Sequence, residues 1–454
     1  MSFFKAYDMR GRYGVDFNDE LVGKIGAALP KVVGGGRWLV GRDVRTSSPA
    51  VRNALVGGLA SSGAEVTDLG PCTTPMVYFF TAEDGFDGSV MVTASHNPAE
   101  DNGLKVSKKT SLPVGYADGL NEVERIVAAE GFAPVCEASA KVLPDALARY
   151  VAWQREAVND SLLAGLKYAV DCSNGMASIL VRDLFPGATL LNDSPDGTFP
   201  AHSPNPLKAE AREQIASVVR RDGLDFGVIF DGDADRCMFV DERGEFVQPD
   251  YLIPIVARAT ARAAEARGES RAGCKVIHDV RTSRGATEVL REDGFEPVMV
   301  PVGHAFAKPA LRRCGALCGG ELAGHYYFAE FFGCDSGVLA ARRIIAEAVR
   351  AKALGMTFSQ MMSPISDRYA NSGEMNFRVE DKDAAIARAL KIAGERLPVQ
   401  VARTDMDGVR IDFAEGWFNI RKSNTEPYLR LVAECDSAAR LEEWTGLLKE
   451  VIEG

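Results

Sequence analysis

The sequence predicts an α/β protein of parallel strands covered by helices, followed by an α+β unit at the C-terminus. Short apolar runs alternate with helical segments along most of the chain, which is the pattern of parallel α/β layers. Polar residues repeatedly follow the ends of these runs, where the ligand sites of α/β proteins lie. A length of 454 residues is enough for about three domains.

Local patterning predicts the individual elements of the α/β part. Each predicted strand is a short apolar run that leads into a polar loop. These strands cover residues 38–40, 90–92, 168–170, 227–230, 275–277 and 297–302. One helix is predicted to begin at Pro49 and a second to cover 176–185. A third ends near Glu292, and a fourth covers 338–354.

The last part of the chain has a different pattern. Residues 416–420 and 428–432 predict two strands that flank a loop, and residues 437–452 predict a closing helix. That order fits an α+β domain. Composition changes near 134–144, 244–249 and 357–367 suggest soft boundaries between domains.

Composition excludes several classes of partner. The net charge is −11, from 52 basic and 63 acidic residues, so the overall field repels nucleic acid and anionic lipid. The N-terminus does not have the pattern of a signal peptide, and no apolar run is long enough to span a bilayer. The nine cysteines are scattered and predict free thiols in a reducing cytoplasm. We therefore expect a cytoplasmic protein without nucleic-acid or membrane partners.

The hexapeptide Thr93-Ala94-Ser95-His96-Asn97-Pro98 directly follows the apolar run at 90–92. This layout places one serine just past the end of a strand, where α/β proteins often present a nucleophile. The same residues fit an ordinary polar turn, because Ser, Asn and Pro are common in turns. The hexapeptide alone supports both interpretations.

The segment Asp231-Gly-Asp-Ala-Asp-Arg236 follows the predicted strand at 227–230. Its alternate carboxylates form a dense set of oxygen ligands that suits Mg²⁺. An EF-hand loop begins with the same spacing, but Arg236 stands where its sharp turn requires glycine. An aspartate nucleophile of the haloacid-dehalogenase type and a solvated acidic turn are further alternatives.

Two other loops carry ligand-binding chemistry. The glycine-rich loop 319–325 contains Glu321, which can accept hydrogen bonds from sugar hydroxyls. The loop 421–430 places Arg421 and Arg430 around hydroxyl and amide groups, which suits a phosphate. It lacks the P-loop pattern, and in isolation it also fits a surface hairpin.

Taken together, these segments resemble the α-D-phosphohexomutase superfamily, and within it the bacterial phosphomannomutases of the phosphomannomutase/phosphoglucomutase group. The motifs that match in order are 93–98, 231–236, 320–325 and 421–426. The segments 7–11, 102–105, 277–281, 303–306, 325–328 and 334–337 also fit. The resemblance covers nearly the whole chain.

The resemblance implies four domains around a central cleft, three of similar mixed α/β topology and a C-terminal α+β domain. Its expected boundaries are 1–142 with the phosphoserine loop, 143–245 with the metal-binding loop, 246–360 with the sugar-binding loop, and 361–454 with the phosphate-binding loop. A monomer or homodimer is expected.

The activity that the resemblance implies is phosphomannomutase, which interconverts mannose 6-phosphate and mannose 1-phosphate. The reaction would pass through phospho-Ser95 and a hexose 1,6-bisphosphate, with Mg²⁺ as cofactor, and would supply GDP-mannose synthesis. Phosphoglucomutase or a dual-specificity enzyme is the alternative within the superfamily. A sugar-phosphate-binding protein without turnover and a calcium-binding module are alternatives from other classes.

The resemblance also assigns roles to individual residues of this chain. The catalytic residues are Ser95, Lys105, His304 and Arg10. The metal ligands are Ser95, Asp231, Asp233 and Asp235, with Arg236 and His96 nearby. The sugar-binding residues are Glu321, Ala323, His325 and Arg281. The phosphate-binding residues are Arg421, Ser423, Asn424, Thr425 and Arg430. Ala323 stands where many relatives carry serine, which leaves the choice between mannose and glucose open.

Overall fold

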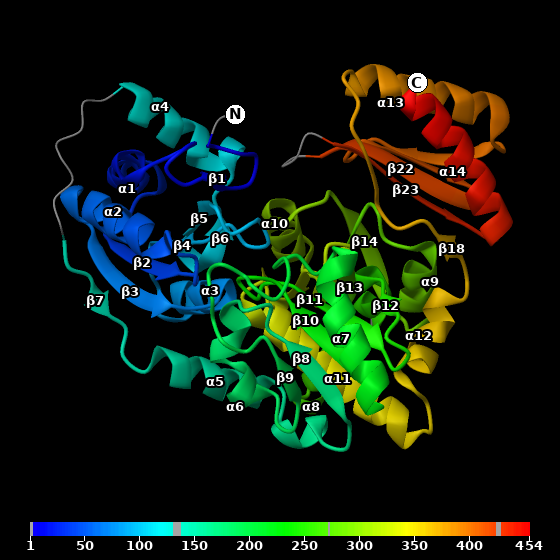
Figure 1. Ribbon diagram of the computed structural model, residues 1–454, viewed down its shortest axis with the longest axis horizontal. Helices are drawn as coiled ribbons and strands as arrows, with labels where there is room; N and C mark the ends of the chain where they lie inside the picture. The colour runs from blue at the N-terminus through cyan, green and yellow to red at the C-terminus, as the bar shows by residue number, and fades with distance from the viewer. Residues whose placement is uncertain (1–2, 130–137, 271–272, 424–427) are drawn as a thin grey trace.

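The computed structural model describes residues 3–129, 138–270, 273–423 and 428–454. The chain forms four sheets with their own helices (Figure 1). The first sheet and the C-terminal sheet lie at the upper left and upper right of the view, and the second and third sheets lie below and between them. Within these ranges no helix is long and apolar enough to cross a membrane.

The first sheet combines parallel and antiparallel strands. It comprises β1 (Met9–Arg12), β2 (Arg37–Arg42), β3 (Glu65–Pro71), β4 (Gly88–Val92), β5 (Asp101–Lys108), β6 (Leu112–Pro113) and β7 (Lys141–Val142). Its helices are α1 (Asp19–Val33), α2 (Ser48–Ser61), α3 (Thr74–Glu83) and α4 (Asn121–Ala129). α1 begins where the side chain of Asn18 accepts a hydrogen bond from the amide of Leu21, a typical N-cap.

The second and third sheets repeat this design. The second comprises β8 (Tyr168–Asp171), β9 (Thr189–Leu191), β10 (Phe226–Phe230), β11 (Cys237–Asp241) and β12 (Phe246–Val247), with helices α5 (Ala146–Ala157), α6 (Val181–Leu184) and α7 (Ala209–Asp222). The third comprises β13 (Lys275–Asp279), β14 (Glu296–Val300), β15 (Cys318–Gly320), β16 (Tyr326–Phe328) and β17 (Cys334–Asp335), with helices α8 (Ile253–Ala266), α9 (Arg284–Glu292), α10 (His304–Cys314), α11 (Gly337–Ala353) and α12 (Phe358–Ser366).

All three sheets share one strand order. Each has a parallel trio with its first strand in the middle, namely β3-β2-β4, β9-β8-β10 and β14-β13-β15, followed by an antiparallel neighbour, β5, β11 or β16. The expectation of three domains with similar mixed α/β topology is therefore confirmed.

The C-terminal domain is an antiparallel sheet with two helices packed against each other, as expected of an α+β fold. Its strands are β18 (Ala370–Asn371), β19 (Met375–Phe377), β20 (Gln400–Thr404), β21 (Val409–Phe413), β22 (Gly416–Lys422) and β23 (Leu429–Cys435). Its helices are α13 (Lys382–Arg396) and α14 (Ala438–Glu453), which Figure 1 shows together beside the sheet.

Hydrophobic packing joins the first three domains more tightly than the fourth. One large buried cluster includes side chains from α3, β8, β10 and α11, so it runs through all three α/β domains. The C-terminal domain has a separate core around Phe418 and Trp444. A small cluster of Leu322, Trp417 and Val432 links it to the third domain.

Two local predictions differ from the structure. The stretch 176–185 is split into a 3₁₀ turn at Met176–Ile179 and the short helix α6, because the amide of Leu180 bonds to the carbonyl of Ala177, three residues back, and the φ of Leu180 is −116°. The strand predicted at 297–302 ends at Val300, and the amide of Val302 donates to Asp407.

α12 crosses position 360, the expected end of the third domain, and packs on α9 and α11. We therefore propose that the third domain extends through α12.

Candidate active site

The loop that carries Ser95 follows β4 and adopts a strained backbone. Ser95 has a φ of 53°, a left-handed conformation that is uncommon for residues other than glycine. Its amide donates to Oγ1 of Thr93 at 2.8 Å. Only 1% of Ser95 is exposed, so the structure buries the serine that the sequence presents as a nucleophile.

Arg45 donates hydrogen bonds to the backbone of this loop. Its fully buried guanidinium donates to the carbonyl oxygens of Ser95 at 2.9 Å and Asn97 at 2.7 Å. It also donates to the carbonyls of Pro98 and Asp101. Asp43 pairs with the same guanidinium at 3.1 Å. Because four carbonyls of one loop converge on one side chain, Arg45 fixes the conformation in which Ser95 faces the second domain.

The three aspartates lie in the turn between β10 and β11 and converge on one point. Asp231, Asp233 and Asp235 are buried, and one oxygen of each lies within 4.8 Å of the others. Oδ1 of Asp233 and Oδ1 of Asp235 are buried and make no hydrogen bond to any described residue. Buried polar atoms are normally paired, so this donor set fits a hard divalent cation such as Mg²⁺.

Electrostatics at the cluster are those expected of crowded carboxylates. Burial, with repulsion from Asp235 and Asp233, raises the pKa of Asp231 well above its usual range. Lys105 Nζ lies 2.7 Å from Asp233 and 2.6 Å from Asp235. Burial acts to lower the pKa of Lys105, but these two carboxylates outweigh it and raise the pKa. Lys105 is therefore a fixed cation at the cluster.

Ser95 and its neighbours meet this cluster directly. The Ser95 hydroxyl donates to Oδ2 of Asp231 at 3.0 Å and lies 3.1 Å from Nδ1 of His96. Nε of Arg236 lies 3.8 Å from Asp231 and 3.9 Å from Asp235. The loop that carries Ser95 and the turn that carries the three aspartates thus meet at one centre.

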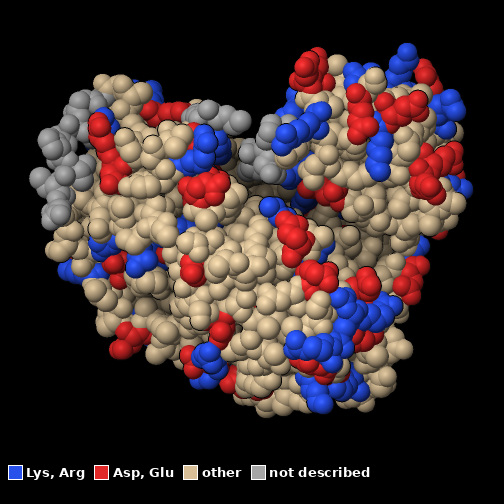
Figure 2. Space-filling model, in the orientation of Figure 1, with Lys and Arg blue, Asp and Glu red and all other residues tan. Residues whose placement is uncertain are grey.

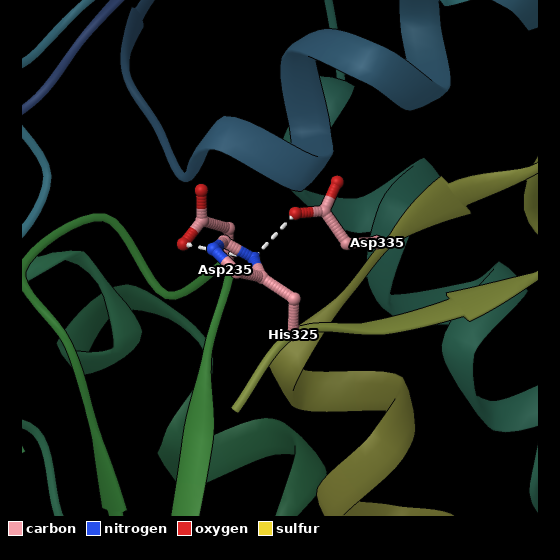
Figure 3. Close-up of side chains that lie close together, drawn as sticks. All are labelled: Asp235, His325 and Asp335. Carbon is pink, nitrogen blue, oxygen red and sulfur yellow. Dashed lines mark hydrogen bonds and ion pairs between the residues drawn. The ribbon is translucent and has the colours of Figure 1, made fainter. Parts of the chain in front are cut away.

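His325 of the third domain reaches the turn that carries the three aspartates. Figure 3 shows its ring between Asp235 and Asp335, with Nδ1 2.7 Å from Oδ2 of Asp335 and 3.8 Å from Oδ1 of Asp235. Nζ of Lys308 lies 2.8 Å from the other oxygen of Asp335. Burial acts to raise the pKa of Asp335, but Lys308 and His325 outweigh it and lower the pKa.

Glu321 lies just after β15, on the wall of the third domain. It accepts hydrogen bonds from the hydroxyl of Tyr327 at 2.8 Å and the amide of Gly303 at 3.2 Å. Burial raises its pKa. Ala323 lines the same wall. One carboxylate oxygen of Glu321 is thus fixed in direction before any ligand arrives.

Arg10 and His304 face the same opening. Arg10 pairs with Asp8 at 2.6 Å and donates to the carbonyl of Ala94 at 3.2 Å. His304 is the first residue of α10, and its Nδ1 is buried without a hydrogen-bond partner among the described residues. Burial, helped by Lys308, lowers the pKa of His304 well below its usual value, so its ring is neutral at pH 7.

The C-terminal domain contributes a basic wall. Arg421 lies on β22 and Arg430 on β23, and both approach the carboxylate of Glu374, at 3.8 Å and 3.3 Å. Arg281 of the third domain reaches the same carboxylate at 2.7 Å. Ser423 follows β22, whereas Asn424 and Thr425 lie outside the described residues.

A cavity of about 630 Å³ brings these groups together. Its lining includes Arg10, His96, Arg236, Arg281, His304, Glu321, Ala323, His325, Arg421 and Arg430. Figure 2 shows the surface hollowed between the first and the C-terminal domains, with basic side chains beside the opening. The volume lies within the range of small-molecule sites. Ser95, Lys105 and the three aspartates are buried.

Several polar residues of the site escape sequence reasoning. No local sequence pattern indicates a role for Arg45, Asp279, Glu374, Lys308 or Asp335. Asp335 belongs to a segment that matches the superfamily, which is the one signal available for it. Asp279 likewise lies in the matching segment 277–281, whereas Arg45, Glu374 and Lys308 reach the site only through tertiary packing.

Family models cover nearly all of the chain. Models described as Phosphoglucomutase/phosphomannomutase, alpha/beta/alpha domains I, II and III, match residues 1–134, 145–244 and 248–369. The model of the C-terminal domain of the same family matches residues 374–449.

Curated relatives and solved structures are similar over their full length. A protein of Xanthomonas campestris named "Phosphohexose mutases" is 38% identical, with 99% of each chain covered. A phosphomannomutase of Salmonella montevideo is 36% identical, with 96% of this chain and 95% of its own length covered. A phosphoglucomutase/phosphomannomutase family protein of Burkholderia thailandensis has a TM-score of 0.84 at 28% identity, with 99% and 96% covered.

Proposed function

The chain belongs to the phosphoglucomutase/phosphomannomutase family, and on that premise we propose that it interconverts mannose 6-phosphate and mannose 1-phosphate. The proposed route passes through phospho-Ser95 and a hexose 1,6-bisphosphate. Glucose phosphates are the alternative substrates, alone or alongside mannose phosphates.

One observation carries the proposal: a single cavity is lined by Arg421 and Arg430 of the C-terminal domain and by residues that directly cover a buried serine–aspartate centre. Ser95 and Asp231 meet behind His96 and Arg236, which line the cavity. Arg421 and Arg430 line the opposite, C-terminal side. A hexose with one phosphate fits this polarity, because the arginines can hold its phosphate while a hydroxyl approaches Ser95.

Phosphoryl transfer depends on position and charge neutralisation. In the forward step, the bond from Ser95 Oγ to phosphorus breaks as a sugar hydroxyl bonds to that phosphorus. Lys105, Arg10 and Arg236 supply fixed positive charge around the transferring group. Asp231, Asp233 and Asp235 would hold Mg²⁺, which when bound offsets negative charge on the phosphoryl oxygens. The second transfer returns the other phosphoryl group to Ser95.

The sugar hydroxyl loses a proton as it attacks, and His304 is the best placed of the three proposed proton-transfer residues. Its ring lines the cavity and is neutral at pH 7, so a ring nitrogen can accept a proton. Lys105 and Arg10 remain charged, because neighbouring carboxylates outweigh the effect of burial and raise their pKa values. We therefore assign proton transfer to His304 and electrostatic support to the other two.

The intermediate must present both of its ends to Ser95 in turn. Glu321 is suited to hold sugar hydroxyls in both orientations, since Tyr327 and Gly303 fix its carboxylate in the cavity wall. The phosphate at the far end would alternate between the two positions and be gripped by Arg421, Ser423 and Arg430. Asn424 and Thr425 complete the proposed grip.

The choice of mannose is supported by the names of the curated relatives, several of which are phosphomannomutases at 34–36% identity. Ala323 lines the sugar wall without a hydroxyl, so it offers no hydrogen bond to the sugar from its side chain. Discrimination would then rest on Glu321 and its neighbours.

Paired kinetics test the proposal. The kcat/KM for mannose 1-phosphate and for glucose 1-phosphate are measured with a catalytic amount of the matching 1,6-bisphosphate. We expect turnover of both with a higher value for mannose 1-phosphate. A higher value for glucose 1-phosphate would favour the alternative, and turnover of neither would refute the mutase proposal.

A further inference from the structure

Glu374 joins three arginines from two domains. It follows β18 and precedes β19, at the entry to the C-terminal domain. Its carboxylate lies 2.7 Å from Arg281, 3.3 Å from Arg430 and 3.8 Å from Arg421. The side chain is 18% exposed and lines the cavity. Glu374 therefore neutralises charge at the point where the basic wall meets the cavity.

A further ion pair connects Arg281 to the loop that carries Glu321. Asp279 holds Arg281 at 2.7 Å through its Oδ2 and accepts from the amide of Leu322 through the same oxygen. Leu322 directly follows Glu321 in the chain. A continuous set of charged contacts thus runs from the sugar loop through Arg281 and Glu374 to the two arginines of the C-terminal domain.

Arg421 remains incompletely paired in this arrangement. Its Nε and Nη1 are buried and form no hydrogen bond within the described residues. Asp407 is 3.5 Å from Nη1, so this arginine has two carboxylates near it without close hydrogen bonds. A buried guanidinium with unused donors is suited to receive an anion, because it has already lost its water.

We propose that Glu374 is the counterion of this basic wall, and that its charge limits how tightly the wall binds a phosphate. Asp407 supports it from the other side of Arg421. This inference rests on the proposed function, because in a mutase cycle the wall must release one phosphate of the bisphosphate and then bind the other. A wall without Glu374 would hold the far phosphate tightly and delay that exchange.

The physical argument is electrostatic. A phosphate that reaches Arg421 and Arg430 is brought close to the negative charge of Glu374, and that repulsion is weakly screened in a partly buried site. Replacing Glu374 with glutamine removes the repulsion and keeps the size of the side chain. Aspartate at the same position keeps the charge and shortens the side chain.

The test is calorimetric titration of the full-length protein with inorganic phosphate at two salt concentrations. We expect Glu374→Gln to bind phosphate at least about fivefold more tightly than the wild type at low salt, with a smaller gain at high salt. Glu374→Asp should stay within about twofold of the wild type, because the charge remains. Glu380→Gln changes an exposed glutamate of the same domain and should leave binding unchanged.

Unchanged or weaker phosphate binding by Glu374→Gln would overturn the proposal. So would equal tightening by Glu374→Asp, because geometry rather than charge would then be the cause. If Glu374→Gln does not fold, Asp407→Asn provides the same test: tighter binding supports the proposal and unchanged binding overturns it.

Mutase kinetics separate this inference from the proposed function. For Glu374→Gln, we expect KM for the hexose 1-phosphate and kcat to fall together, because binding tightens and exchange slows. An inactive wild type would refute the proposed function while the phosphate titration still decides the role of Glu374. An active wild type with unaltered phosphate binding in the variant would refute the inference alone.

Discussion

The hydroxyl of Ser95 donates to Asp231 at 3.0 Å, although the two residues are 136 positions apart in the chain. The contact requires the first and second domains to approach closely at Gly232. A Cβ added to Gly232 would lie 2.5 Å from the carbonyl oxygen of Ser95, which is closer than real contacts allow. The loop that carries Ser95 and the turn that carries the aspartates therefore form one structural unit.

Replacing Asp231 with asparagine should weaken Mg²⁺ binding and stabilise the metal-free protein. The raised pKa of Asp231 reflects burial and repulsion from the other aspartates, and a neutral side chain relieves both. Thermal unfolding with and without Mg²⁺ measures the two effects. The wild type should gain about 2–3 kcal/mol at saturating Mg²⁺, and Asp231→Asn much less.

Asp222→Asn is the matched control, because Asp222 lies at the exposed end of α7. It should retain the full Mg²⁺ effect. An undiminished Mg²⁺ effect in Asp231→Asn would remove Asp231 from the metal site.

Replacing Arg45 with lysine should reduce kcat far more than it changes KM. A single ammonium cannot donate to the four carbonyls that the guanidinium holds, so the loop would lose the geometry of Ser95. Misplacement of a reacting group by about 1 Å costs roughly 100-fold in rate, while Arg421 and Arg430, the proposed phosphate ligands, are untouched. Steady-state kinetics on the mutase reaction provide the measurement.

Arg52→Lys is the control for Arg45→Lys. Arg52 lies on α2 of the same domain and pairs with Asp68 at 2.8 Å. Replacing it with lysine should leave kcat and KM near their wild-type values. Wild-type kcat in Arg45→Lys would show that the loop holds its geometry without the guanidinium.

Asp250 should make the protein less stable as the pH rises from about 4 to 7. It lies buried in the turn Pro249–Leu252 and accepts from the amide of Ser283 at 2.8 Å. Burial, with Glu434 and Asp279 nearby, raises its pKa from 3.8 to about 7. The folded state therefore holds a proton that the unfolded state has released over this range, so stability is lost until the folded-state pKa is passed.

Asp250→Asn keeps the acceptor for Ser283 and removes this pH dependence. The stability advantage of the variant should grow by up to about 3 kcal/mol between pH 5 and pH 8. Thermal unfolding of both proteins at these two pH values measures it. An advantage that stays constant with pH would show that Asp250 is ionised in the folded protein throughout.

Local patterns account for much of the fold and for part of the candidate site. The strands at 38–40, 168–170 and 275–277 and the helix at 338–354 are found where the sequence predicts them, because each has a short, regular apolar pattern. The aspartates of 231–235 are equally predictable, since their crowding on one turn requires no knowledge of other segments.

The remaining features depend on contacts between distant segments. Glu374 has no local signal, yet it meets Arg281 across 93 positions. Ser95 lies in a typical turn sequence, but its burial follows from the packing of the second domain on the first. The helix predicted at 176–185 is interrupted at Leu180, whose amide bonds to the carbonyl of Ala177 in a 3₁₀ turn. Tertiary packing, by contrast, places Glu374 and Ser95.

The most direct test of the central claim is the site of phosphoryl attachment. The protein is incubated with a hexose 1,6-bisphosphate and digested, and its peptides are analysed by mass spectrometry, with Ser95→Ala treated in parallel. We predict one phosphate on the peptide that contains Ser95, none in Ser95→Ala, and loss of mutase activity in that variant by about 10⁴-fold or more. Full activity in Ser95→Ala, or a phosphate on another residue, would contradict the account.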